Sequence, residues 1–83
     1  MLRREIWVDQ QDRVVRYNLA YINPLMYPGD DGRVLGYDSA HGTHHRHGNG
    51  RVTAVNFQSF GPIEARFQKE WSRLAKEARD AKD

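Results

Sequence analysis

The 83-residue sequence contains no cysteine and only three prolines, and none of its apolar runs is long enough to span a bilayer. Without cysteine the chain has no disulfide framework and no thiolate zinc site. Residues 1–9 are too charged for a signal peptide. These absences predict a cytoplasmic protein with no membrane partner. At this length we expect a single domain over residues 1–83, built on a small aromatic-rich core.

The sequence also has little excess charge of either sign, because 13 Lys and Arg residues are balanced by 11 Asp and Glu residues, for a net charge of +2. The excess lies in residues 33–51, which hold three arginines and one aspartate. A local positive segment of this kind attracts an anion such as a phosphate backbone.

Histidine is confined to the same segment, where all four copies lie within seven residues: His41, His44, His45 and His47. Histidine titrates closest to physiological pH, so this cluster indicates proton transfer, metal ligation or contact with an anion.

Period-two alternation predicts strands over residues 3–9, 13–22, 33–38 and 51–57. In the second strand we expect Val15, Tyr17, Leu19 and Tyr21 to face the core. The histidine segment is then the connection between two strands that we expect to pair.

Apolar residues at spacings of three and four from Phe60 to Ala78 predict a helix over residues 61–80, with either Ser59 or Gly61 as its cap. The predicted fold class is α+β: a four-stranded, mostly antiparallel sheet with one long C-terminal helix packed on one face. One helix leaves the other face of the sheet uncovered, which is compatible with a homodimer or a bound companion chain.

The first functional hypothesis is cleavage of RNA by general acid–base catalysis. Attack by the ribose 2′-hydroxyl needs a base, an acid for the leaving 5′-oxygen and a cation near phosphorus, and two imidazoles can supply the base and the acid without a metal or other cofactor. In extended backbone His45 and His47 point the same way, and an arginine fork suits phosphate oxygens. The candidate catalytic residues are Tyr37, Asp38, His44, His45, Arg46 and His47, and the candidate substrate-binding residues are Arg33, His41 and Arg51.

Two other interpretations compete with this one. His45 and His47 could offer two nitrogens to a metal, with Asp38 adding an oxygen, although Arg46 between the two ligands is electrostatically unfavourable. The histidines could also be ordinary loop residues that dock on a partner chain.

Residues 36–47, Gly-Tyr-Asp-Ser-Ala-His-Gly-Thr-His-His-Arg-His, resemble the TumE-like toxins of bacterial and archaeal type II toxin–antitoxin systems. The signature of these toxins is Tyr-Asp-Asn-Ala followed by a cluster of histidines. The likeness covers roughly residues 33–75, including the Ser59-Phe60 pair that leads the helix. The sequence departs from the signature at Ser39, which stands in place of asparagine, and at residues 48–50, Gly-Asn-Gly, which we expect to form a flexible exit from the motif.

The resemblance implies a toxin that a cognate DNA-binding antitoxin neutralises, with residues 37, 38 and 44–47 as the matching motif positions. Together with the chemistry above, it predicts a metal-independent ribonuclease that acts on an RNA substrate. The alternative is a non-enzymatic binding module whose histidines ligate a metal or dock a partner protein.

Overall fold

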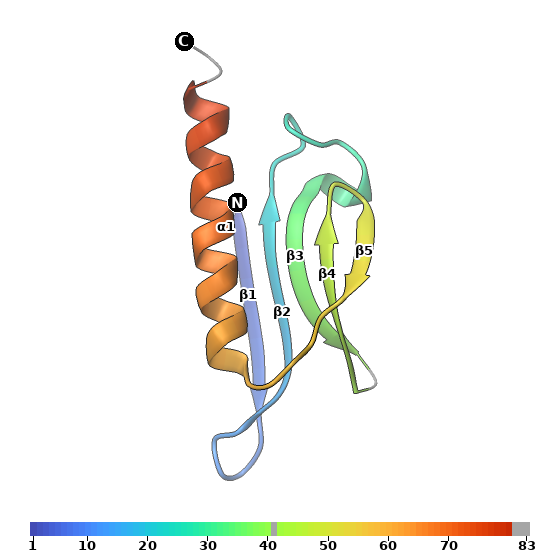
Figure 1. The fold of residues 1–83 in the computed structure, drawn as a ribbon, viewed down its shortest axis with the longest axis vertical. Helices are drawn as coiled ribbons and strands as arrows, with labels where there is room; N and C mark the ends of the chain where they lie inside the picture. The colour runs from blue at the N-terminus through green and yellow to red at the C-terminus, as the bar shows by residue number, and fades with distance from the viewer. Residues whose placement is uncertain (41, 81–83) are drawn as a thin grey trace.

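The computed structural model describes residues 1–40 and 42–80 and shows an α+β fold, in which a five-stranded antiparallel sheet carries one C-terminal helix (Figure 1). The predicted α+β class is confirmed, but the sheet has five strands instead of four. The strands follow one another in the order β1-β2-β3-β4-β5. In chain order the elements are β1 (Leu2–Val8), β2 (Val14–Ile22), the 3-10 helix η1 (Asp30–Gly32), β3 (Arg33–Ala40), β4 (Thr43–Gly48), β5 (Arg51–Ala54) and α1 (Phe60–Asp80).

The additional strand is the histidine segment itself, which was expected to be a connection. As β4 it lies between β3 and β5, so the predicted strands 33–38 and 51–57 do not pair with each other. Asn49 and Gly50 both have positive φ, of 48° and 81°. An Asn-Gly pair readily adopts positive φ at both positions, which is the conformation of a tight two-residue hairpin turn. Residues 48–50 therefore join β4 to β5 closely, where a flexible exit was expected.

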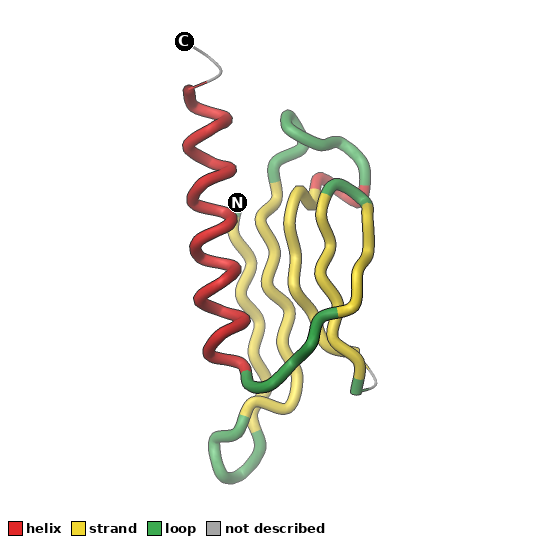
Figure 2. Tube along the Cα trace, in the orientation of Figure 1, coloured by secondary structure: helices red, strands yellow, loops and turns green. Residues whose placement is uncertain are grey.

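Helix α1 runs along the strands on one face of the sheet and packs against β2 and β3 (Figure 2). The side chains between the layers are apolar and aromatic, as the alternation in residues 13–22 and 33–38 predicted. The buried core consists of Tyr17, Leu19, Tyr21, Val34, Leu35, Tyr37, Ile63 and Phe67.

Val15 is an exception to the predicted inward set, because 62% of its surface is exposed. The pairing of β1 with β2 shifts between Trp7 and Val8, so that Trp7 lies opposite Arg16 and Val8 lies opposite Val14. Val15 is the extra residue of this β-bulge and leaves the alternation. Val14 packs against the core in its place.

Helix α1 begins at Phe60, immediately after Ser59, which makes Pro62 its third residue. Proline is tolerated there because the first N–H groups of a helix have no intrahelical partner. Neither helix of the described residues is both long and apolar enough to cross a membrane.

Candidate functional site

Strand alternation divides the histidine strand β4 between the two faces of the sheet. His44 and Arg46 lie on the face covered by α1, where Arg46 reaches Glu70 of the helix and His44 reaches Tyr17 of the core. His45 and His47 lie on the opposite, open face. The predicted site residues therefore form two separate clusters.

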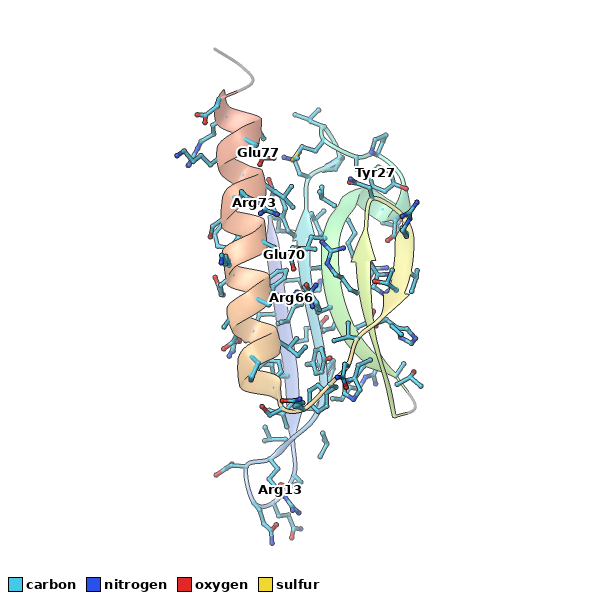
Figure 3. All side chains as sticks on the ribbon, in the orientation of Figure 1. Arg13, Tyr27, Arg66, Glu70, Arg73 and Glu77 are labelled. Carbon is cyan, nitrogen blue, oxygen red and sulfur yellow. The ribbon has the colours of Figure 1, made fainter. Side chains whose placement is uncertain are left out.

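On the helix face, three side chains form a closed cluster around the carboxylate of Glu70. The Tyr37 hydroxyl donates a hydrogen bond to Glu70 Oε1, and Arg46 Nη2 donates to Glu70 Oε2 at 2.6 Å. Arg46 Nε also donates to the Tyr37 hydroxyl oxygen at 3.1 Å. Arg66 Nε lies 3.5 Å from Glu70 Oε1, and both side chains project from α1 toward the strands (Figure 3). This cluster ties β3 and β4 to the helix.

The charges of the helix-face cluster are fixed at neutral pH. Burial raises the pKa of Tyr37 to about 12, and its hydrogen bond to Glu70 adds to the effect. Burial acts to raise the pKa of Glu70, but the donors Arg46 and Tyr37 outweigh burial and hold that pKa below its usual value. The hydrogen bond to Glu70 raises the pKa of Arg46. Tyr37 and Arg46 were predicted to be catalytic, but the polar groups of both side chains bind Glu70.

On the open face, Asp38 is the centre of the second cluster. Its Oδ2 lies 2.9 Å from His47 Nε2 and 3.6 Å from Arg33 Nη1, and its Oδ1 lies 3.8 Å from His45 Nδ1. The side chain of Arg33 passes over Gly36, where a Cβ atom would come within 2.9 Å of Arg33 Cδ. The missing side chain of Gly36 therefore lets Arg33 reach along β3 to Asp38.

Both ring nitrogens of His47 are covered by protein groups. Arg33 Nη2 lies 3.1 Å from Nδ1, and since a guanidinium can only donate, Nδ1 accepts and the neutral ring carries its proton on Nε2. Nε2 is buried, and its contact with Asp38 is close but not aligned as a hydrogen bond. The predicted pair His45 and His47 does share one face, but His47 has no ring nitrogen turned to a substrate.

His44 is held by two aromatic side chains on the other face of β4. Its Nδ1 lies 2.9 Å from the Tyr17 hydroxyl, and its ring stacks on Phe57 with centroids 3.8 Å apart and planes 3° from parallel. Burial, followed by the charge of nearby His45, lowers the pKa of His44. Burial raises the pKa of Tyr17 to about 12, so its hydroxyl stays protonated. The His44 imidazole is therefore neutral at neutral pH.

His44 and His45 border the same hollow at the end of the sheet. Strand β5 pairs with β4 only from His45 to Gly48, and beyond this pairing a hollow of about 450 Å³ opens beside β4. It is lined by Gly42, Thr43, His44, His45, Ala54, Val55 and Phe57. His44 is hydrogen-bonded through Nδ1 to Tyr17, and the nearest carboxylate oxygen to His45 is Asp38 Oδ1, 3.8 Å from its Nδ1, so that no hydrogen bond or ion pair among the described residues occupies Nε2 of either ring. His45 is partly exposed, at 35% of its side chain.

The other predicted residues lie apart from this hollow. Arg51 is exposed and pairs with Gly48, at the far end of β4 from His44. Arg33 is engaged by Asp30 and Asp38. His41 lies outside the described residues.

Two residues that the sequence analysis did not select are part of these clusters. Glu70 interrupts the apolar stripe of α1 between Phe67 and Trp71, and a carboxylate at such a position signals a buried cationic partner. Tyr17 was assigned to the core alone, but a buried tyrosine hydroxyl usually needs a polar partner. Its partner is His44.

Over residues 1–40 and 42–80 no group of three His, Asp or Glu side chains has the arrangement of a metal site. The pair predicted to ligate a metal, His45 and His47, shares Asp38, but Arg33 covers the second nitrogen of His47.

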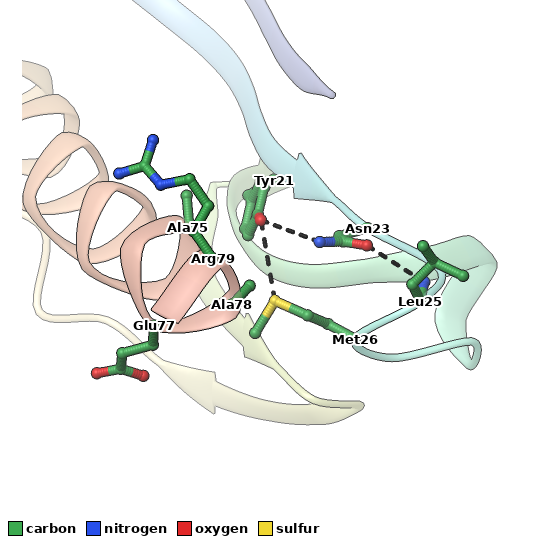
Figure 4. A pocket seen from close by; sticks show the side chains of 8 residues that line it. All are labelled: Tyr21, Asn23, Leu25, Met26, Ala75, Glu77, Ala78 and Arg79. Carbon is green, nitrogen blue, oxygen red and sulfur yellow. Dashed lines mark hydrogen bonds between the residues drawn. The ribbon is translucent and has the colours of Figure 1, made fainter. Parts of the chain in front are cut away.

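A further hollow of about 500 Å³ lies far from the histidines, between the second half of α1 and the connection from β2 to β3 (Figure 4). Its lining is mainly apolar and includes Leu25, Met26 and Ala78. Asn23 Nδ2 donates to the Tyr21 hydroxyl at 3.2 Å, and Glu77 and Arg79 of α1 also line the hollow. None of the described histidines lies in its lining.

No protein-family model, curated protein or solved structure matches the chain. The resemblance of residues 36–47 to TumE-like toxins thus stays a prediction from the sequence.

Proposed function

We propose that this chain is the toxin of a toxin–antitoxin system and cleaves RNA without a metal, with His44 and His45 as the acid–base pair. The observation that carries the proposal is the shared hollow, which both imidazoles line, with His44 held through Nδ1 by Tyr17 and Nδ1 of His45 on the side of Asp38. The resemblance of residues 36–47 to TumE-like toxins supports the toxin role and implies a cognate DNA-binding antitoxin as partner.

His44 is suited to act as the base because its lowered pKa keeps it neutral at neutral pH. In the tautomer required, Nδ1–H donates to the Tyr17 hydroxyl oxygen, and Nε2 takes the proton of the ribose 2′-hydroxyl. The 2′-oxygen then attacks phosphorus and forms a 2′,3′-cyclic phosphate.

His45 is assigned as the acid. Its imidazolium gives the Nε2 proton to the leaving 5′-oxygen, which departs as a 5′-hydroxyl group, while the Asp38 carboxylate, 3.8 Å from Nδ1, favours the positive charge on the ring. One proton is taken up by His44 and one is released by His45, so before the next turnover His44 must give a proton to solvent and His45 must take one from solvent.

The test is incubation of the purified chain with labelled cellular RNA, with and without EDTA. We expect cleavage that survives EDTA and that falls by about 10²-fold or more in His44→Gln and in His45→Gln, the scale on which general acid–base catalysis contributes. Lys76→Gln, on the exposed face of α1, is the control for surface substitution and should cleave like the unmodified chain.

A pH–rate profile separates the two roles. On the acidic side of the profile, the rate should fall as the base becomes protonated. The apparent pKa of this fall should lie below the ordinary histidine value of ~6.5, because the pKa of His44 is lowered. Cleavage abolished by EDTA would indicate that the histidines ligate a metal instead of acting as acid and base. No cleavage by the well-folded chain would favour the binding module instead.

A further inference from the structure

Strands β2 and β3 separate at the end of the sheet where His44 lies. Their pairing stops at Asn18 and Asp38, yet β2 continues to Val14 beside β1 and β3 continues to Ala40 beside β4. The two hairpins therefore diverge toward their lower ends (Figure 1). A hollow of about 250 Å³ opens here, lined by Val15, Arg16, Ser39, Ala40, Gly42 and His44. His44 thus borders two hollows, this one and the one that it shares with His45.

Arg16 supplies an unneutralised positive charge to this second hollow. The strand arginines that form ion pairs with a carboxylate are Arg3, Arg4, Arg33 and Arg46. Among the described residues Arg16 forms no ion pair, and neither does Arg51, which lies at the far end of β4. Arg16 is therefore the strand arginine that can offer its guanidinium to an anion beside His44.

The guanidinium of Arg16 lies over an exposed aromatic ring. Its Cζ atom is 4.8 Å from the centroid of the Trp7 indole, and Trp7 is 42% exposed although it is among the largest apolar side chains. The cation–π contact keeps the guanidinium near the indole ring, and Arg16 is exposed, so its N–H groups are accessible to a ligand. Unpaired bases stack on aromatic rings and on arginine planes, while guanidinium N–H groups bind phosphate.

We propose that Arg16 and Trp7 form a binding subsite for single-stranded RNA next to the scissile phosphate. Arg16 binds a backbone phosphate at the entrance of the hollow, and one base stacks on the platform that Arg16 and Trp7 make together. The choice of RNA as ligand rests on the function proposed above, and the subsite supplies the cation that Arg46 cannot supply while it is bound to Glu70.

The test measures binding separately from cleavage. In the full chain carrying Trp71→Phe, Trp7 is the remaining tryptophan and reports its own surroundings by fluorescence. The probe is a short, unstructured 2′-O-methyl RNA oligonucleotide, which lacks the attacking hydroxyl and cannot be cut. We expect saturable quenching of Trp7 and an affinity that falls about tenfold in Arg16→Ala. The slope of log affinity against log salt should fall by about 1 in this variant.

Arg13→Ala is the matched control. Arg13 lies three residues away, is exposed and is paired with Asp9, and it does not line the hollow. Both substitutions are on the surface, so circular dichroism should show the same fold for both variants. Affinity in Arg13→Ala should stay within about twofold, because exposed ion pairs contribute little.

The two proposals fail in different ways. Quenching that depends on Arg16, without cleavage of ordinary RNA, would overturn the ribonuclease and retain the subsite. Cleavage that depends on His44 and His45, with equal oligonucleotide affinity in Arg16→Ala and Arg13→Ala, would retain the ribonuclease and overturn the subsite. Binding to the antitoxin that is lost in Arg16→Ala, without quenching by the oligonucleotide, would also overturn it and assign this face to a protein partner.

Discussion

The two faces of β4 carry polar clusters of opposite character, although their residues alternate along one short strand. On the helix face, Arg46 is bound to Glu70 and to the Tyr37 hydroxyl, and the charges stay constant over the range in which enzymes work. On the open face, Asp38 lies beside the imidazoles of His45 and His47, and no aligned hydrogen bond joins it to either ring.

This difference separates the anchoring of β4 from its histidines. Arg46, whose charge is fixed, ties β4 to α1, whereas the side-chain hydrogen bonds and ion pairs of His44, His45 and His47 are with residues of β2 and β3. The consequence is that loss of the fixed-charge cluster around Glu70 should lower stability, whereas replacement of His44, whose pKa is lowered, should change how stability depends on pH.

The largest effect should follow from Glu70→Ala, which breaks the helix-face cluster. The variant leaves Arg46 and the Tyr37 hydroxyl without their acceptor, and hydrogen bonds to charged groups contribute about 1.5–3 kcal/mol each. We expect the free energy of unfolding, measured by urea titration, to fall by about 2–3 kcal/mol. Glu77→Ala removes an exposed carboxylate 4.0 Å from Arg73 on the same helix and should change stability by less than about 0.5 kcal/mol. Equal losses in both variants would contradict an anchoring role for the cluster.

A smaller effect should follow from Gly36→Ala, which disturbs the open face. The added Cβ would lie 2.9 Å from Arg33 Cδ and 3.3 Å from the carbonyl oxygen of Leu19. Arg33 must then leave Asp38 and His47, and overpacking of this kind typically costs about 1–2 kcal/mol in thermal or urea unfolding. Gly61→Ala is the matched substitution, because nothing lies within 4 Å of its Cβ position in α1. It should leave stability unchanged or raise it by about 0.5 kcal/mol. A neutral Gly36→Ala would show that the position of Arg33 does not depend on Gly36.

The smallest effect concerns His44, whose pKa is lowered by burial and by the charge of His45. Above the unfolded value of ~6.5 neither state holds the proton, so His44 does not affect stability there. As the pH falls below about 6.5, the unfolded chain takes up the proton first, so stability decreases until the pH has passed the folded pKa. We expect His44→Gln to lose less stability than the unmodified chain between about pH 7.5 and about pH 5, measured by urea unfolding. An identical loss in both proteins would contradict the lowered pKa.

Most of the fold follows from local patterns in the sequence. Alternation in residues 13–22 and the apolar stripe of α1 identify the core, because both periods reflect burial directly. The histidine strand could not be recognised in this way, since neither of its faces is apolar. The Asn49-Gly50 turn was the available signal, because this dipeptide between two runs is typical of a tight hairpin. The bulge at Val15 depends on its pairing with β1 and has no local signal.

The candidate site was predictable in composition but not in arrangement. The sequence shows that histidine and arginine cluster, and extended backbone correctly predicts that His45 and His47 share a face. Which nitrogens face a substrate depends on contacts across the sheet, such as Arg33 with His47. The partner of His44 is Tyr17, 27 residues away in the chain, and no spacing rule connects the two.

The strand order described above has a kinetic consequence. Every strand pairs with its neighbour in the chain, so each pairing closes a short loop at a low cost in chain entropy. The contacts of α1 with the strands join segments far apart in the chain, for example Tyr37 with Glu70. We therefore expect the hairpins to form rapidly and docking of the helix to limit the folding rate. Strand β4 would then pair with β3 and β5 before α1 docks and Glu70 binds Arg46.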